Sequence, residues 1–114
     1  MKRLVLLGLL VSGLASSACS TPTLSPKAHD VVATRNAPGG GCQSLQYLVG
    51  KGGGTFGGGW VANEDLVEYA MNDLRNKGAD LGANYIQTDP PMMGSGSGTT
   101  TTVTISGTAY RCPN

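Results

Sequence analysis

The chain has 114 residues, enough for one small domain, and its 18 Gly and 6 Pro against 13% charged residues indicate a lean domain with many loops. Lys and Arg total 8 and Asp and Glu total 7, so the net charge of +1 lacks the basic excess that binding to a phosphate backbone requires, and we expect no nucleic-acid partner. No apolar run approaches the roughly 20 residues that span a bilayer, which excludes a channel or transporter.

The first 18 residues have the pattern of a secretory signal peptide. Lys2 and Arg3 precede an uncharged stretch at residues 4–14 that is rich in Leu and Val, and small residues follow as far as Ala18. The alternative is an N-terminal membrane anchor, but the apolar stretch is shorter than a spanning helix needs. We therefore expect an exported protein.

Cys19 follows the small residues directly. Residues 14–19 (Leu-Ala-Ser-Ser-Ala-Cys) resemble the lipobox of bacterial lipoproteins, in which the Cys is acylated, for example with palmitate, and becomes the first residue. Ser16 stands where an aliphatic residue is usual, so cleavage by the general signal peptidase, which would give a soluble protein, stays open. Lipidation is the preferred interpretation, because two or three acyl chains hold a protein stably on a membrane.

The three cysteines support this division of the chain. An odd thiol is a liability in an oxidising compartment, so if Cys19 carries the lipid, Cys42 and Cys112 are left to form a structural disulfide. No CxxC spacing exists, so neither a redox pair nor a zinc knuckle is indicated. A disulfide around the folded part of such a small domain would contribute much of its stability.

Residues 19–41 are predicted to be a lipidated N-terminus followed by a flexible tether. The stretch contains three prolines, several Ser and Thr and the run Gly-Gly-Gly, and its only apolar pair is Val31 and Val32. His29, the only His, lies here beside Asp30, and one such pair does not make a metal site. The folded domain is therefore expected at residues 42–112.

The first strand is expected at residues 43–49, where Leu45, Tyr47 and Val49 alternate with other side chains. The Gly-rich stretch 50–59 should end it as a loop. Gly52, Gly54 and Gly57 match GxGxxG, but residues 60–63 separate them from the next helix, so a dinucleotide site is rejected.

The helix is expected at residues 64–81. Asn63 is a suitable N-cap, and Glu64 and Asp65 lie where the helix dipole favours negative charge. Gly82 is the signal for its C-terminal end. The side chains expected to face the core recur at helical spacing; they are Leu66, Val67, Ala70, Met71, Leu74, Gly78 and Leu81.

Two further strands complete the predicted fold, at residues 84–88 and 99–112, with a loop at 89–98 and a bulge at Gly107. The disulfide requires the start of the first strand to adjoin the end of the last. The last strand also returns from the preceding one by a hairpin, so these two are antiparallel. The last strand is therefore expected between the other two and antiparallel to both, and a right-handed helix crossover joins the first two. We expect an α+β fold, a two-layer sandwich with one main helix on a small three-stranded sheet (β-α-β-β) and a disulfide between the first and last strands.

No catalytic residues, metal site or cofactor are predicted. The only His lies in the expected tether, and the acidic side chains are mostly on the expected solvent side of one helix, so we expect no enzyme. Met92 and Met93 beside a Gly-Ser loop could bind copper, but they lack a third ligand. Phe56 and Trp60 in the Gly-rich loop are the candidate contact surface, together with the sheet face and its edge strands.

Several segments resemble a domain-of-unknown-function family of small Gram-negative outer-membrane lipoproteins. They are residues 63–66 (Asn-Glu-Asp-Leu), 72–77 (Asn-Asp-Leu-Arg-Asn-Lys), 81–85 (Leu-Gly-Ala-Asn-Tyr) and 107–112 (Gly-Thr-Ala-Tyr-Arg-Cys). That family is itself similar to RcsF, the envelope-stress sensor of the Rcs phosphorelay. RcsF has more cysteines than this chain can pair, so its disulfide-dependent sensing is not carried over.

The resemblance implies an outer-membrane or periplasmic location, a helix on a small sheet and a disulfide, and it implies no catalytic residues. By the sorting rule of enteric lipoproteins, Ser20 after Cys19 favours the outer membrane, with the domain facing the periplasm. The leading hypothesis is a non-catalytic, lipid-anchored envelope lipoprotein that binds another envelope protein. The alternative is a periplasmic lipoprotein that binds a small ligand or metal through the Met92-Met93 loop and the Gly-rich loop.

Overall fold

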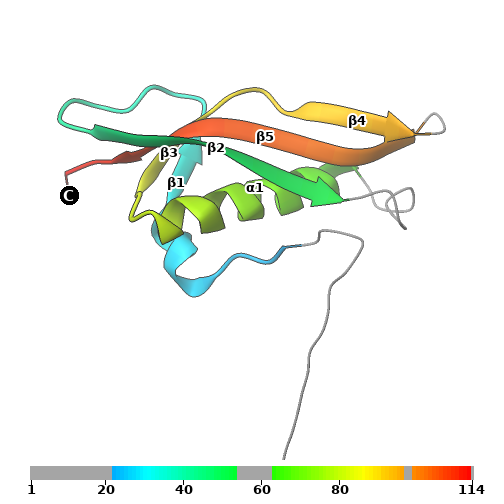
Figure 1. The fold of residues 1–114 in the computed structure, drawn as a ribbon, viewed down its shortest axis with the longest axis horizontal. Coiled ribbons are helices and arrows are strands. Elements are labelled where there is room, and N and C mark those ends of the chain that lie inside the picture. The colour runs from blue at the N-terminus through cyan, green and yellow to red at the C-terminus, as the bar shows by residue number, and fades with distance from the viewer. Residues whose placement is uncertain (1–21, 54–62, 97–98, 114) are drawn as a thin grey trace, which may run out of the picture.

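The computed structural model describes residues 22–53, 63–96 and 99–113, and they form one α+β unit (Figure 1). The elements in chain order are η1 (Pro26–Asp30), β1 (Val32–Thr34), β2 (Gln43–Gly53), α1 (Asn63–Asp80), β3 (Tyr85–Thr88), β4 (Met92–Gly96) and β5 (Thr99–Arg111). The α+β class with one main helix is confirmed. The expected three-stranded sheet is too small, because the sheet has five strands.

The sheet is built around the last strand. Its order is β1-β3-β5-β2, and β4 also pairs with β5. β5 is antiparallel to β2, β3 and β4, whereas β1 runs parallel to β3. The predicted position of the last strand, between the first two predicted strands and antiparallel to both, is therefore confirmed.

β3 and β4 follow one another along the same edge of β5. β3 pairs with Gly107–Tyr110 and β4 with Thr99–Thr104, so the two strands resemble one long strand interrupted at residues 89–91. Pro90 and Pro91 cause the interruption, because proline has no N–H to donate to the ladder. Asp89 still donates its backbone N–H to the carbonyl of Ser106 at 2.8 Å.

The bulge expected at Gly107 is not observed, because Gly107 pairs in register with Leu48 and with Thr88. The irregularity lies in the partner strand, where the register shifts between Ser44 and Gln46. Gly107 has a different role. A Cβ there would lie 2.6 Å from the carbonyl oxygen of Gln87, so only glycine allows the strands and the Ile86 side chain to approach this closely.

Helix α1 agrees with the predicted bounds to within one residue at each end. Its C-terminal end is a Schellman motif: Gly82 has φ of 84°, Ala83 donates its N–H to the carbonyl of Gly78, and Gly82 donates to that of Ala79. Gly82 adopts this left-handed conformation without the steric cost that a Cβ would add. The predicted C-terminal signal is confirmed.

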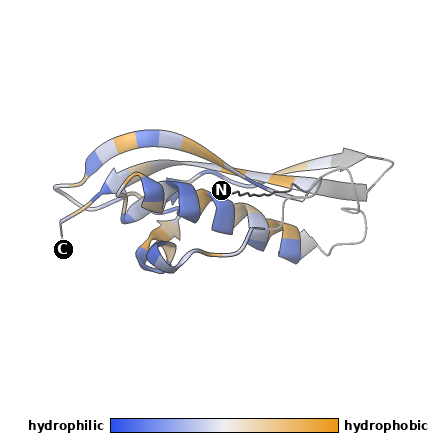
Figure 2. Ribbon diagram, turned by 60° about the horizontal axis from the view of Figure 1, so that its bottom comes forward, coloured by the Kyte–Doolittle hydropathy of each residue, from blue (hydrophilic) through white to orange (hydrophobic). Residues whose placement is uncertain are grey.

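The core lies between α1 and one face of the sheet. Leu66, Ala70 and Leu74 of α1 are fully buried, whereas Leu81, which we expected to face the core, is exposed because it follows the last turn of the helix. The buried residues from the other elements are Val31, Leu48, Ala83, Ile86, Val103, Ile105 and Ala109. Hydrophobic and hydrophilic residues alternate along the strands (Figure 2), as expected for a sheet with one buried face.

We predicted the whole Gly-rich stretch 50–59 as a loop. This is wrong for its first residues, because β2 continues to Gly53. Gly50 and Gly52 are buried directly under α1. A Cβ on Gly50 would lie 2.4 Å from the carbonyl oxygen of Ala70, and one on Gly52 would lie 2.5 Å from that of Leu66. The helix thus packs directly against the strand backbone, which requires glycine at both positions. This packing outweighs the low propensity of glycine for strands.

The prediction of a flexible tether is wrong for residues 22–34, which include η1 and β1. Residues 22–31, here called the strap, run along the side of α1 that faces away from the sheet (Figure 1). Ala28 and Val31 of the strap are buried, and β1 follows as an edge strand of the sheet. The folded unit therefore begins near Pro22 rather than at Cys42.

Candidate interaction surface

The sheet face opposite α1, here called the open face, is not covered by any described residue. Leu48, Gly50 and Gly52 of β2 point towards α1, so the alternating residues Tyr47 and Val49 point the other way. Strand register places the remaining open-face positions. The large apolar side chains exposed on this face are Val32 (54%), Tyr47 (57%), Val49 (36%) and Met92 (69%).

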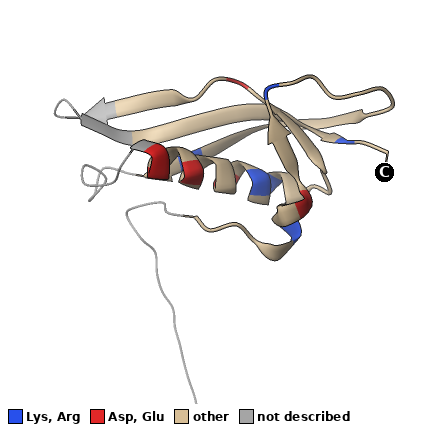
Figure 3. Ribbon diagram, turned by 180° about the vertical axis from the view of Figure 1, so that it is seen from behind, with Lys and Arg blue, Asp and Glu red and all other residues tan. Residues whose placement is uncertain are grey.

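The open face carries few charged groups; the exposed carboxylate of Asp89, which follows β3, is one of them, because it accepts the hydroxyl proton of Tyr47. In the described strands only Lys51 and Arg111 carry charged side chains, and Figure 3 shows the sheet as nearly uniform in colour while acidic residues cluster at the start of α1. The central row of the face comes from β5 and consists of Thr102, Thr104, Ser106, Thr108 and Tyr110. An exposed face that combines Tyr and Met side chains with few charges has the composition of a protein-interface core.

Two tyrosines close one end of this face. The rings of Tyr85 and Tyr110 meet edge to face, with centroids 6.4 Å apart. Tyr85 donates its hydroxyl proton to the carbonyl of Asn36 at 2.8 Å, which holds the segment after β1 against β3. The aromatic end is therefore fixed in position rather than free to rearrange.

The disulfide joins the strands at the same end. Cys42 and Cys112 are bonded across 70 residues of sequence, as predicted. Asn84 holds the second cysteine from the other side: its side-chain amide donates to the carbonyl of Cys112 at 2.9 Å, and its Oδ1 accepts from the Cys112 N–H at 2.8 Å. The start of β2, the end of β5 and the entry to β3 are thus tied together.

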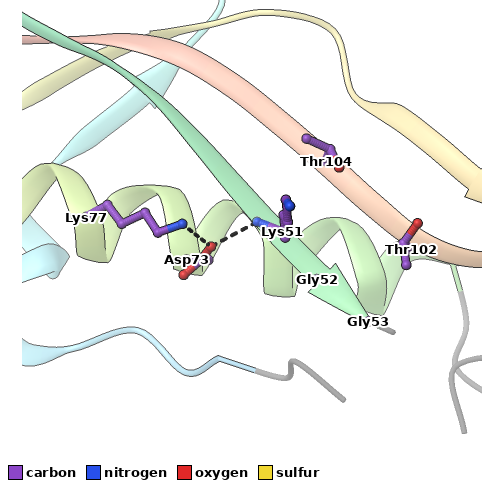
Figure 4. Close-up of a pocket in the computed structure, with 7 residues that line it drawn as sticks. All are labelled: Lys51, Gly52, Gly53, Asp73, Lys77, Thr102 and Thr104. Carbon is purple, nitrogen blue, oxygen red and sulfur yellow. Dashed lines mark hydrogen bonds and ion pairs between the residues drawn. The ribbon is translucent and has the colours of Figure 1, made fainter. Parts of the chain in front are cut away.

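The outer edge of β2 is partly capped by α1. Asp73 accepts the backbone N–H of Lys51 at 2.9 Å and pairs with the ammonium of Lys77 at 3.0 Å (Figure 4). Lys77 also donates to the carbonyl of Val49 at 2.8 Å. A hollow of about 560 Å³ opens beside these residues, bounded also by Gly52, Gly53, Thr102 and Thr104. Asp73 and Lys77 bind the backbone of β2 and each other, and so they cover part of its strand edge.

A smaller, mostly apolar hollow of about 180 Å³ lies between α1 and β1. Val67 and Met71 of the helix and Ile105 of β5 form its floor, and Arg35 and Asp89 are at its rim. Its apolar floor suits an apolar group, and Thr34 and Thr88 add hydroxyls to its lining.

Several sequence-predicted site residues are placed by the structure. Met92 and Met93 are consecutive residues of β4 and therefore point to opposite faces, so they cannot share one metal ion. His29 and Asp30 are exposed in η1. Cys19, Phe56 and Trp60 lie outside the described residues, as do Gly54 and Gly57 of the GxGxxG match.

Among the described residues, no three His, Cys, Asp or Glu side chains are grouped so that they could hold a metal ion. Across the same residues, no helix combines the length and hydrophobicity that crossing a bilayer demands.

Sequence reasoning did not find the side chains of α1 that hold the strap. Arg75 donates from Nε to the carbonyl of Val31 at 2.9 Å and from Nη2 to those of Ala28 and His29 at 3.2 Å. Asn72 and Asn76 donate to the carbonyls of Pro22 and Thr23, and Asn76 also accepts the N–H of Ser25. The spacing of Asn72, Arg75 and Asn76 could have indicated a polar face of the helix that binds another segment, because residues three and four apart share one helix face.

These features define a small α+β domain, closed by one disulfide, with a strapped helix on one side and an open sheet face with few charges on the other. The chain belongs to the family described as domain of unknown function DUF4156, whose model matches residues 22–112, and this match includes the strap.

The chain is 30% identical over 112 residues to the uncharacterized protein YjeI of Escherichia coli (strain K12), and the alignment covers 96% of each chain. The YjeI proteins of Escherichia coli O6:H1 and of Shigella flexneri are similar to the same extent. No solved structure matches the chain.

Proposed function

We propose that this protein is a non-catalytic, lipid-anchored lipoprotein of the outer membrane whose domain faces the periplasm and binds another envelope protein, in a structural or stress-related role. The observation that carries the proposal is the open face, where Val32, Tyr47, Val49 and Met92 are exposed among few charged side chains. Tyr and Met are enriched, and charged residues are depleted, where proteins bind one another.

Two further observations support the envelope location. The signal-peptide pattern and the lipobox-like residues 14–19 indicate export and acylation of Cys19. The Cys42–Cys112 disulfide suits an oxidising compartment such as the periplasm.

The test is site-specific photocrosslinking in cells that make the full chain. A photoreactive residue at Val49 or at Met92 should give an adduct with the same envelope protein, because both positions lie on the open face. The same residue at Glu68, an exposed position on α1, is the matched control and should give no such adduct.

Binding of the identified protein in purified form then decides the assignment. Val49→Lys and Met92→Lys add charge to the open face without filling the core, so each should weaken binding at least about tenfold while leaving the melting temperature nearly unchanged. Equal crosslinking from Glu68, or binding unaffected by both substitutions, would overturn the open face as the contact surface.

A further inference from the structure

The strap determines how the domain can sit on a membrane. Pro22 is the first described residue, and its carbonyl is already bound by the side chain of Asn72 at 3.1 Å. Only three residue steps separate it from Cys19, a span of at most about 11 Å. A lipid on Cys19 would therefore leave almost no slack between the bilayer and the folded unit.

The strap lies on the far side of α1 from the sheet. Leu66, Ala70 and Leu74 of α1 face the sheet, whereas Asn72 and Asn76, which hold the strap, lie on the opposite part of the helix circumference. Figures 1 and 3 show the same arrangement, with the strap and the open face on opposite sides of α1. A helix about 10–12 Å in diameter and the thickness of the sheet separate the two.

We infer that the bilayer surface lies against the strap side of α1, within about 1 nm, and that the open face is directed away from the membrane. This inference rests on the proposed acylation of Cys19, and the occupant it assigns to the strap side is the lipid surface itself. The open face is then the part of the domain most accessible to a partner across the periplasm.

Several bonds from α1 side chains fix the position of the strap on the helix. Arg75 binds three backbone carbonyls with its fork of donors, Asn72 and Asn76 bind two more, and Lys27 pairs with Asp80 at 3.0 Å. Released as far as β1, the chain between Cys19 and the sheet would extend to about 45 Å, and the orientation would be lost.

Electrostatic attraction to anionic lipid is not what holds the strap side near the membrane. The start of α1 is acidic, with Glu64, Asp65 and Glu68 all exposed. Closeness to the bilayer therefore depends on the covalent anchor, and the purified Cys19→Ala protein should not bind vesicles of phosphatidylethanolamine and phosphatidylglycerol.

The experiment measures fluorescence quenching in the lipidated full-length protein, reconstituted into those vesicles with a nitroxide on a fraction of the headgroups. A thiol-reactive fluorophore is placed at Glu68→Cys on α1 or at Met92→Cys on the open face, with the disulfide kept oxidised. Quenching should be several-fold stronger at position 68 than at position 92. Equal quenching at the two positions, or stronger quenching at 92, would overturn the inference.

A strap-release variant tests the cause. Asn72→Ala, Arg75→Ala and Asn76→Ala together should reduce the difference between the two positions to less than about twofold, because the three α1 side chains that bind the strap backbone are removed. Asp65→Ala, an exposed change on α1 that touches no strap bond, is the matched control and should keep the difference. Retention of the full difference in a folded release variant would contradict the role of the strap.

The mass of the protein separates this inference from the proposed function. A chain that carries no acyl groups and fails to float with the vesicles would overturn the lipid anchor, and the orientation with it. A lipidated chain that floats but is quenched equally at both positions would overturn the orientation alone.

Discussion

The hydroxyl of Tyr47 donates a hydrogen bond of 2.6 Å to Oδ2 of Asp89 across the central strand of the sheet. Tyr47 belongs to β2 and Asp89 follows β3, so the two residues lie on either side of β5. Their bond links β2, at one edge of the open face, to the segment between β3 and β4. It is the only side-chain hydrogen bond among the described residues that links β2 to that junction.

Tyr47→Phe removes this bond and keeps the ring. Because both side chains are exposed, we expect a coupling energy of only about 0.5–1 kcal/mol. A double-mutant cycle with Asp89→Ala, followed by urea unfolding, measures it. A coupling energy near zero would show that water replaces the bond without cost.

Gly50→Ala should destabilise the domain strongly, by about 3 kcal/mol or to the point of unfolding, because a Cβ there meets the backbone of α1. Backbone cannot rotate away as a flexible side chain can. Gly40→Ala is the matched control, since nothing lies within 4 Å of its added Cβ. Urea unfolding of the two variants checks the prediction, and equal stability would contradict the close packing of α1 on β2.

Cys42→Ser with Cys112→Ser should lower the free energy of unfolding by about 2–5 kcal/mol, the usual cost of removing a native disulfide from a small exported domain. Thermal unfolding of the variant, compared with the parent protein in the presence and absence of reductant, measures the loss. The reduced parent should match the variant; a parent insensitive to reductant would refute the prediction.

Asp73→Ala uncovers the Lys51 N–H and frees Lys77 from its ion pair, which exposes the edge of β2. We expect a loss of about 1 kcal/mol in stability and a clear rise in self-association, because an open strand edge pairs with other chains. Sedimentation velocity over a concentration series is the readout. Asp80→Ala, which breaks only the exposed pair with Lys27, should leave the protein monomeric to the same degree as the parent.

Much of the fold follows from local sequence signals. The apolar spacing from Leu66 to Leu74 defines α1, and Gly82 ends it. The pairing of Cys42 with Cys112 places β5 between β2 and β3, because only that arrangement brings their ends together.

The remaining features depend on contacts that leave no periodic pattern. Gly50 and Gly52 appear to belong to a loop until α1 is packed against them. The strap is held by side chains of α1 that bind its backbone, and backbone bonding selects no residue type in the strap itself. Likewise, β4 (Met92–Gly96) shows no alternation of apolar and polar residues. It forms a strand because its backbone pairs with the edge of β5.

The position of β5 also affects how the chain can fold. β2, β3 and β4 each pair with β5, and among the described strands only β1 and β3 pair without it. β5 comes after the other described strands along the chain, so almost no sheet can form until residues 99–111 are available to pair. Formation of the sheet therefore depends on pairing between segments far apart in sequence, and we expect it to be slower than formation of α1, whose bonds are local.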